Sequence, residues 1–429
     1  MEDILKIDES LIIDESIEKY EYHEYTPVTG TNSLNNAGEI RIDIQTQDLF
    51  THPSESYLLV EGRLTKADGT SFVDGDKITL TNNGIMHLFK NAKYNLSGQE
   101  IENINHPGQG TTMLGLLKYP DDFSKSKGLN QLWYKDTSED ADENNNGFTV
   151  RQRYIIQSPN PKGTFSFRIP LKHIFGFAED YNKVIYGFKQ ELSLYRSQDD
   201  DDAIFRANNV DAGKVILDKL SWFVPHVIPA DAQKFQLYKL IEQKKTFQVG
   251  YRKRQCDTFS VPQSTNFSWR LAVKTSPEKP RYIIIGFQTN KSNSQTVNPS
   301  IFNHCDVKDI HVTLNSRRYP EINYILNFQQ QKFSRAYGDA AEFKAKFYNM
   351  DELVSCQNIN PDEYKTLYPL FVFDVSNQEE RLKNSVADIQ VKTTFNSNPP
   401  LNTEAFALVI SDKIISFESD GKNLNVILN

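Results

Sequence analysis

The sequence predicts an all-β protein with two consecutive antiparallel β-sandwiches, on the basis of three observations. The chain has 429 residues, more than one hydrophobic core usually organises, and this length suits two domains of about 200 residues each. The composition favours strands, because aromatic residues make up 12% of the chain while methionine and cysteine are scarce. Short segments with the polarity pattern of strands recur in both halves of the chain.

Residues 1–24 are expected to form an acidic amphipathic arm ahead of the first sandwich. Ile4, Ile7 and Leu11 follow helical spacing and are separated by mostly polar, acidic positions. Such an arm suits a partner protein better than an anionic membrane, which favours lysine and arginine on the polar face of a helix. A disordered tail is the alternative interpretation. These three apolar residues are therefore the candidate partner-binding positions of the arm.

The first sandwich is predicted over residues 25–219. Ile40, Ile42 and Ile44 alternate with polar residues, which is the period of two expected of a half-buried strand. Further strands are predicted at residues 57–64, 78–80, 94–96, 150–156, 164–169, 188–194 and 215–218.

Two acidic stretches interrupt this series, at residues 138–146 and 199–212. Stretches of this composition cannot bury enough apolar surface to fold alone, so we expect exposed loops that are remote from both cores. A calcium-binding loop is not supported, because the spacing of glycine and of a closing glutamate does not fit.

Residues 220–244 are predicted to connect the two sandwiches and to end in a helix. Trp222 and Phe223 are large apolar anchors, whereas Pro225 and Pro229 argue against a regular helix and against a central strand. The stretch lacks the glycine, serine and charge of a flexible linker, so we interpret it as a rigid, partly buried connector. The alternative is a single interior strand followed by a loop.

The second sandwich is predicted over residues 245–429, with a helical pattern at residues 333–348 inside it. Its strands are expected at residues 246–251, 266–274, 282–288, 309–314, 322–328, 370–375, 388–395, 405–410, 414–418 and 424–428. Each half thus contributes about eight strands, and eight antiparallel strands in two packed sheets form a jelly roll. The predicted fold is two consecutive eight-stranded jelly rolls with short helices in their loops, although periodicity alone also allows other sandwich topologies.

A weak internal repeat supports two copies of one fold. A strand ends at Leu96 and is followed by a small turn, and a second strand ends in the same way at Leu314. We therefore expect the two halves to share their strand order, with Leu96 and Leu314 in equivalent places. A second pair of matching stretches, residues 169–177 and 362–369, is expected to place a helix before a strand in each half.

The sequence carries no motif of a catalytic, cofactor-binding or metal site. The eight histidines show no metal-ligand spacing, and the glycine-rich residues 106–112 lack the Lys-Ser/Thr pair of a phosphate loop. No nucleophile elbow is present. We predict no catalytic residues, no cofactor and no metal, and hence a protein that is not an enzyme.

Charge and hydropathy limit the partners of the chain. A net charge of −8 argues against a nucleic-acid-binding surface spread over the sequence, so we expect no sequence-specific nucleic-acid partner. The small basic clusters at residues 252–254, 125–127 and 317–318 are expected to be solvated rims or subunit contacts. Three widely spaced cysteines favour a reducing compartment. No apolar run approaches the roughly 18 residues of a membrane span.

Several stretches, taken in their order along the chain, resemble a known family. They are residues 80–89, 94–98, 165–177, 282–289, 314–320 and 371–378. Together they resemble the double-jelly-roll major capsid proteins of tailless icosahedral DNA viruses, which belong to the same lineage as adenoviruses. The nearest likeness is to the hexon-like proteins of Polinton/Maverick elements and adintoviruses. The chain is short for that family, which argues against large outer towers.

The resemblance implies a structural virion protein. Members of the family form homotrimers with a pseudo-hexagonal outline, because each chain supplies two jelly rolls. These capsomers then assemble into an icosahedral capsid with neighbouring capsomers, a penton and minor capsid proteins. The resemblance also implies synthesis in the host cytoplasm and assembly in the nucleus. The alternative function from a different class is a lectin-like module that binds carbohydrate or a receptor, because lectins also use jelly rolls.

Overall fold

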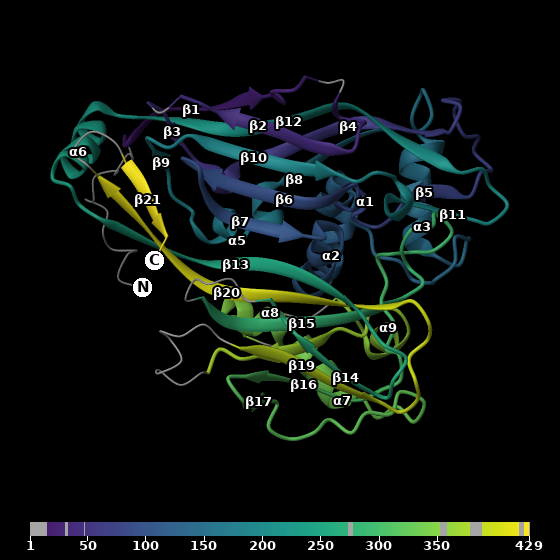
Figure 1. The fold of residues 1–429 in the computed structure, drawn as a ribbon. Helices are drawn as coiled ribbons and strands as arrows, with labels where there is room; N and C mark the ends of the chain where they lie inside the picture. The colour runs from purple at the N-terminus through teal and green to yellow at the C-terminus, as the bar shows by residue number, and fades with distance from the viewer. Residues whose placement is uncertain are drawn as a thin grey trace, which may run out of the picture.

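A computed structural model shows two β-sandwiches stacked one above the other in Figure 1, with the helix α6 (Asp231–Glu242) at one end of the stack. The structure describes residues 15–30, 33–46, 48–272, 278–351, 358–377, 388–419 and 424–428. Ile4, Ile7 and Leu11 of the predicted arm lie outside these described residues.

The first sandwich consists of two facing antiparallel sheets. One sheet has the strand order β8-β4-β12-β3-β9, with β1 also paired to β12, and the other has the order β2-β10-β6-β7. The strands are β1 (Ile17–Tyr25), β2 (Gly38–Ile44), β3 (Phe50–Thr51), β4 (Tyr57–Lys66), β6 (Phe89–Leu96), β7 (Gln99–Asn105), β8 (Thr164–Pro170), β9 (Ile185–Tyr186), β10 (Gln190–Arg196) and β12 (Gly213–Pro229). A separate pair joins β5 (Ile78–Leu80) to β11 (Ile204–Arg206).

The second sandwich repeats this arrangement. One sheet has the order β13-β20-β15-β18, with β21 paired to β20, and the facing sheet has the order β14-β19-β16-β17. The strands are β13 (Phe247–Ser260), β14 (Asn266–Arg270), β15 (Lys279–Thr289), β16 (Val307–Leu314), β17 (Arg317–Tyr319), β18 (Phe371–Asp374), β19 (Ile389–Phe395), β20 (Thr403–Ser419) and β21 (Leu424–Leu428).

Both halves have the connectivity of a jelly roll, as the sequence predicts. In chain order, strands one, three, six and eight of each half form one sheet, and strands two, four, five and seven form the other. In the first half these eight are β1, β2, β4, β6, β7, β8, β10 and β12; in the second they are β13 to β20. The alternation of Ile40, Ile42 and Ile44 places all three side chains in the first core.

Short helices fill the loops. They are α1 (Gly84–His87), α2 (Pro107–Lys118), α3 (Asn146–Gln152), α4 (Leu171–Ile174), α5 (Gly176–Asp180), α6 (Asp231–Glu242), α7 (Ser334–Ala341), α8 (Phe343–Tyr348) and α9 (Pro361–Thr366). The strand predicted at residues 150–156 is wrong, because this segment continues α3 as a helical turn. Along α3 and this turn, the buried residues Phe148, Arg151, Gln152 and Ile155 follow helical spacing.

Each of the two predicted stretches places a helix before a strand, but the strands that follow differ in their place in the jelly roll. In the first half, α4 and α5 follow β8 and lead to the seventh strand of the jelly roll, whereas α9 precedes β18, the sixth strand of the second half. The two stretches are therefore not equivalent.

The connector predicted at residues 220–244 needs correction, because its first ten residues belong to strand β12. Trp222 and Phe223 pair with Leu58 and Tyr57 of β4. Beyond them the pairing with β4 ends, and the neighbour on that side is β3, which pairs only at His226. A proline in this part of the strand removes few ladder hydrogen bonds, which explains why β12 continues to residue 229.

Pro225 and Pro229 thus lie within the strand and oppose Tyr22 and Ile17 of β1. Pro225 still contributes to the sheet, since its carbonyl accepts a hydrogen bond of 3.1 Å from the His52 amide. The segment that links the two sandwiches outside their sheets is α6 with its flanking residues. The alternative interpretation, an interior strand, was correct for residues 220–229.

Candidate assembly site

Trp222 anchors the first jelly roll from within. Its side chain is fully buried, and its ring lies 6.1 Å from Tyr94 in a T-shaped contact. Tyr94 belongs to β6 of the facing sheet, so Trp222 joins the two sheets of one sandwich instead of lying between the two sandwiches. Phe223 points to the opposite face of β12, where it stacks on Tyr57 at 5.1 Å.

A buried carboxylate connects the two jelly rolls. Glu102 of β7 is fully buried and accepts hydrogen bonds from the backbone amides of Gly176, Phe177 and Arg254, at 3.0, 3.0 and 2.8 Å. The first two amides begin α5, and the third belongs to β13 of the second jelly roll. Burial raises the pKa of Glu102, and the three amides together with the Arg254 charge oppose this shift.

Arg254 crosses the same junction in the opposite direction. Its guanidinium donates to the carbonyls of His173 and Ile174 at 2.9 and 2.8 Å and pairs with Glu179. Glu179 also accepts from Lys118, at 2.5 Å. Burial opposes ionisation of Glu179, but Arg254 and Lys118 outweigh it and hold its pKa well below the usual range. Burial and the Arg254 charge lower the pKa of Lys118 to about 7.

A second arginine of β13 completes this junction. Arg252 forms an ion pair of 2.5 Å with Asp180, donates to the Phe347 carbonyl at 2.7 Å, and lies 3.7 Å above the Phe347 ring. The basic cluster at residues 252–254 is therefore not a solvated rim or a contact with another subunit, as predicted. Its two arginines hold the two jelly rolls of one chain together, while Lys253 pairs with Glu278 inside the second jelly roll.

Loop residues form a second buried polar contact between the two halves. Asp136 and Arg151 are fully buried and paired at 2.7 Å. The other carboxylate oxygen of Asp136 accepts from Asn298 at 2.9 Å and from Ser300 at 3.0 Å, and both of these residues lie in the second half. The Tyr368 hydroxyl donates to the Asp136 carbonyl at 2.7 Å.

The acidic loops are closer to the cores than predicted. In the first loop, Asn145 is fully buried and caps α3 by accepting from the Phe148 amide. In the second loop, Ala203 is fully buried, and Asp202 accepts from the Asn293 amide of the second half at 2.9 Å. Burial raises the pKa of Asp202 to about 6. Both loops therefore take part in packing, which their composition did not indicate.

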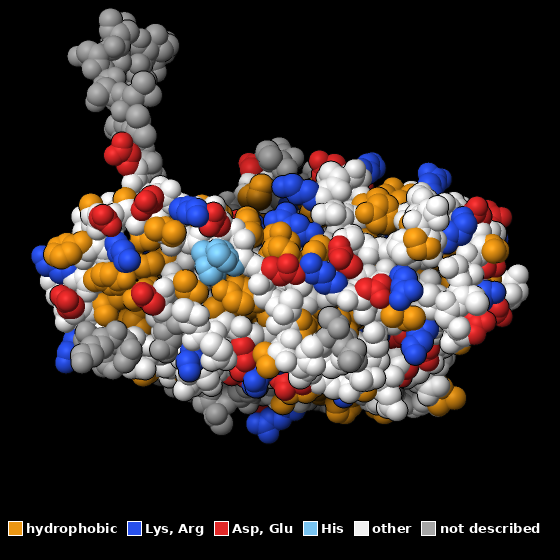
Figure 2. Space-filling model, turned by 90° about the horizontal axis from the view of Figure 1, so that it is seen from above, with side chains coloured by type: hydrophobic (Ala, Val, Ile, Leu, Met, Phe, Trp, Pro, Cys, Tyr) orange, Lys and Arg blue, Asp and Glu red, His pale blue; other side chains and the backbone are white. Residues whose placement is uncertain are grey.

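The outer face of the first jelly roll carries exposed apolar side chains. Every residue from Ile17 to Glu24 of β1 is exposed, although this strand is paired with β12. Figure 2 looks onto this face and shows hydrophobic side chains gathered toward the end that holds α6. The large exposed apolar residues of β1, β12 and α6 are Ile17, Tyr20, Tyr22, Ile228 and Phe235. Patches of this kind mark protein interaction surfaces.

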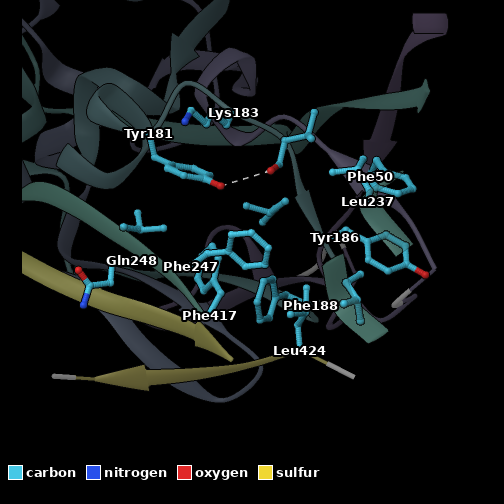
Figure 3. Close-up of a pocket in the computed structure, with 14 residues that line it drawn as sticks. Phe50, Tyr181, Lys183, Tyr186, Phe188, Leu237, Phe247, Gln248, Phe417 and Leu424 are labelled. Carbon is cyan, nitrogen blue, oxygen red and sulfur yellow. Dashed lines mark hydrogen bonds between the residues drawn. The ribbon is translucent and has the colours of Figure 1, made fainter. Parts of the chain in front are cut away.

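A pocket opens at the same end, where α6 meets both jelly rolls. It encloses about 350 Å³ and is lined mainly by aromatic and aliphatic side chains. Figure 3 shows the rings of Phe188, Phe247 and Phe417 close together, with Lys183 and Gln248 at the periphery. We call this the α6 pocket. No local sequence pattern indicates this pocket, because its lining residues come from eight separate elements or loops.

The described residues show no metal-binding arrangement: no three histidine, cysteine, aspartate or glutamate side chains among them are grouped to hold an ion. The adjacent residues His304, Cys305 and Asp306 do not form a metal site: the His304 ring stacks on Phe328 at 4.3 Å, and its Nδ1 accepts a hydrogen bond from the Asp306 amide. Within the described part of the chain, no helix is long and apolar enough to cross a membrane.

Comparisons with known proteins agree with this architecture. A structure of the Sputnik virophage matches with a TM-score of 0.63 and 10% identity, over 99% of this chain and 91% of that chain. The mavirus major capsid protein matches with a TM-score of 0.55 and 12% identity, over 100% and 93%. The Faustovirus major capsid protein matches with a TM-score of 0.54 and 9% identity, over 100% and 94%. At such identities the likeness shows the fold.

A search of curated proteins finds no match to the sequence. The family model described as a double jelly roll-like domain matches residues 78–415, which is well over half of the chain. These residues include most strands of both jelly rolls and the junction between them. The chain therefore belongs to the double jelly roll-like domain family.

Proposed function

We propose that the protein is a major capsid subunit, a structural virion protein without catalytic activity. Three chains form a homotrimer with a pseudo-hexagonal outline, and these hexon-like capsomers assemble into an icosahedral shell. The Sputnik, mavirus and Faustovirus structures that share the fold carry capsid or virus titles, which supports this function.

One observation carries the proposal: two jelly rolls of identical connectivity are fixed to each other by buried ionic contacts within one chain. Each chain is thus a rigid pair of similar blocks. Three such pairs around an axis present six similar blocks, which is the outline that a hexagonal lattice requires. Cyclic symmetry also closes head-to-tail contacts after three subunits.

The exposed apolar face of β1 and α6 supports contacts with neighbouring chains. A large apolar surface of this kind is unfavourable in water and is stabilised when a partner covers it. We assign the partners as other copies of this chain, neighbouring capsomers, a penton and minor capsid proteins.

We further assign the source to the Polinton/Maverick–adintovirus type. The stretches that resemble this type are distributed over both jelly rolls, and their order along the chain supports the assignment. The expected location is the virion capsid, after synthesis in the host cytoplasm and assembly in the nucleus. Thin-section microscopy of expressing cells tests this: shells in nuclei agree with it, and shells confined to the cytoplasm contradict it.

The positions of the tryptophans do not favour the lectin-like alternative. A shallow sugar-binding groove typically exposes tryptophan, yet Trp133, Trp222 and Trp269 are all buried. No observation on the described residues favours this function over the capsid.

The decisive experiment is the mass and shape of the purified full chain. Light scattering is expected to give three chains of 49.3 kDa, about 148 kDa. Negative-stain microscopy is expected to show hexagonal particles or shells. A stable monomer at micromolar concentration, with neither particle form, contradicts the proposal.

A further inference from the structure

The α6 pocket is an apolar site with a cationic rim. Phe188, Phe247 and Phe417 supply aromatic surface to its interior (Figure 3). Helix α6 covers it loosely, since only Ile241 of this helix is buried and Leu237 is half-buried. A pocket of about 350 Å³ with this lining accommodates several aliphatic side chains.

Five lysines lie at the pocket or on and directly after the helix that covers it, and we call these lysines the rim. Lys183 lines the pocket, and Lys234, Lys239, Lys244 and Lys245 lie on α6 or within three residues after it, against the two carboxylates of that helix, Asp231 and Glu242. No carboxylate among the described residues forms a salt bridge with any of these five lysines. An occupant with apolar side chains and carboxylates therefore fits both the interior and the rim.

The N-terminal end of the described chain lies beside this rim. Strand β1 runs antiparallel to β12, so that Ile17 opposes Pro229, and the Ala230 amide donates to the Ser16 carbonyl at 3.0 Å. Ala230 immediately precedes α6. With a helical rise of about 1.5 Å per residue, Leu237 of the pocket lies roughly 10 Å along the helix from this point.

Residues 1–14, which lie outside the described residues, have the chemistry that the pocket requires. They contain the apolar stripe Ile4, Ile7 and Leu11 together with Glu2, Asp3, Asp8, Glu9 and Asp14, against a single lysine. An extended chain covers about 3.3 Å per residue, so the five residues from Ser16 back to Leu11 span up to about 17 Å. This exceeds the distance along α6 to Leu237.

We propose that residues 1–14 dock onto the α6 pocket of their own chain. Their isoleucine and leucine side chains fill the aromatic interior, and their carboxylates pair with the lysines of the rim. The other nearby segment outside the described residues, 420–423, reads Asp-Gly-Lys-Asn and offers no apolar side chain to fill the site. This docking stands apart from the capsid role, because it concerns contacts within one chain.

Disulfide trapping in the full-length protein tests the docking. The variant combines Leu11→Cys with Leu237→Cys and is oxidised with diamide. The expected product has the mass of one chain and yields a linked peptide containing residues 11 and 237. The matched control combines Leu11→Cys with Leu401→Cys, an exposed position close to the opposite end of β20. Linkage in the test variant is expected to exceed linkage in the control several-fold.

Each other outcome of the trapping overturns the proposal. Equal linkage in the two variants means that the arm has no preferred site. Linkage that joins two chains means that the occupant is the arm of a second copy. Because light scattering and microscopy measure assembly separately, trimers and shells without the linkage reject only the docking, whereas the linkage in a monomer rejects only the capsid role.

A dye-binding measurement provides an independent readout. Replacing Ile4, Ile7 and Leu11 by Asp is expected to empty the pocket and to raise the fluorescence of added 1-anilinonaphthalene-8-sulfonate several-fold. The matched variant Lys6→Asp with Ser10→Asp changes the net charge by the same amount but keeps the apolar stripe, so its fluorescence is expected to stay at the parent level. Equal fluorescence in both variants overturns the proposal.

Discussion

Leu96 and Leu314 occupy equivalent positions in the two jelly rolls. Each is fully buried and ends the fourth strand of its half, and each pairs with the first residue of the fifth strand across a two-residue turn. Both turns require a left-handed backbone, with φ of 47° and 82° at Ser97 and Gly98 and of 44° and 73° at the two residues after Leu314. The repeat predicted from these residues is confirmed.

Removing a glycine from the first turn and introducing one into the second are expected to have opposite effects on the free energy of unfolding. Gly98→Ala is expected to cost about 1–2 kcal/mol, because Cβ is strained at positive φ although space is available. Ser316→Gly is expected to stabilise by about 0.5–1 kcal/mol, since it creates the Asn-Gly pair that such hairpins favour. Chemical denaturation measures both. Gly75→Ala is the control, because Gly75 has no positive φ and open space around it.

Trp222→Ala is expected to destabilise the protein by about 3–5 kcal/mol, the usual cost of deleting a fully buried large aromatic side chain. The unfolding midpoint in guanidinium measures the change. Phe235→Ala on α6 is the matched control, because its side chain is 70% exposed and the expected change is within about 0.5 kcal/mol. Similar midpoints for the two variants would contradict the placement of Trp222 between the sheets.

Asp136→Ala is expected to cost about 3–5 kcal/mol, because it leaves the buried Arg151 charge without its carboxylate. The same change at Glu139, which pairs with Lys291 and is itself half exposed, is expected to cost no more than about 1 kcal/mol. Thermal unfolding of both variants checks the comparison. If Asp136→Ala is as stable as the parent, the loop contact does not join the two halves.

Acid is expected to destabilise the fold through His87. Burial lowers the pKa of this histidine to about 3, while an unfolded histidine titrates near 6.5. Between these pH values, His87 binds a proton in the unfolded chain but not in the folded chain. The contribution of His87 to the free energy of unfolding is therefore complete above about pH 6.5 and falls by about 1.4 kcal/mol per pH unit below it.

His87→Leu removes this contribution. The loss of stability between pH 6.5 and 5 is therefore expected to be smaller in the variant by about 2 kcal/mol. Urea unfolding at the two pH values measures it, with His23→Leu on the exposed strand β1 as the control. Identical losses in His87→Leu and the parent would show that His87 does not titrate on unfolding in this range.

Local sequence patterns predicted the strands because burial in a sandwich alternates along each strand, as at Ile40, Ile42 and Ile44. The same patterns misplaced Pro225 and Pro229. A proline is tolerated in a strand wherever few ladder bonds are needed, and the sequence does not reveal that β4 stops pairing at Phe223. The connector was therefore placed about ten residues too early.

The junction could not be predicted from the sequence, because its partners are distant along the chain. Glu102 and the Arg254 amide are separated by 152 residues, and Arg252 and Asp180 by 72. No local pattern distinguishes Arg252 and Arg254 from a solvated basic cluster. The only available signal was their position in a strand with apolar Tyr251 and Cys256 nearby, both of which are buried.

The contacts of Glu102 join the two jelly rolls by a route that is separate from the peptide link between them. Its carboxylate holds α5 and β13 through backbone amides, and no part of that contact passes through α6. A protease that nicks the chain inside α6 is expected to leave both fragments bound to each other. By the same reasoning, a gene split at this point would encode two polypeptides that reassemble into the intact subunit.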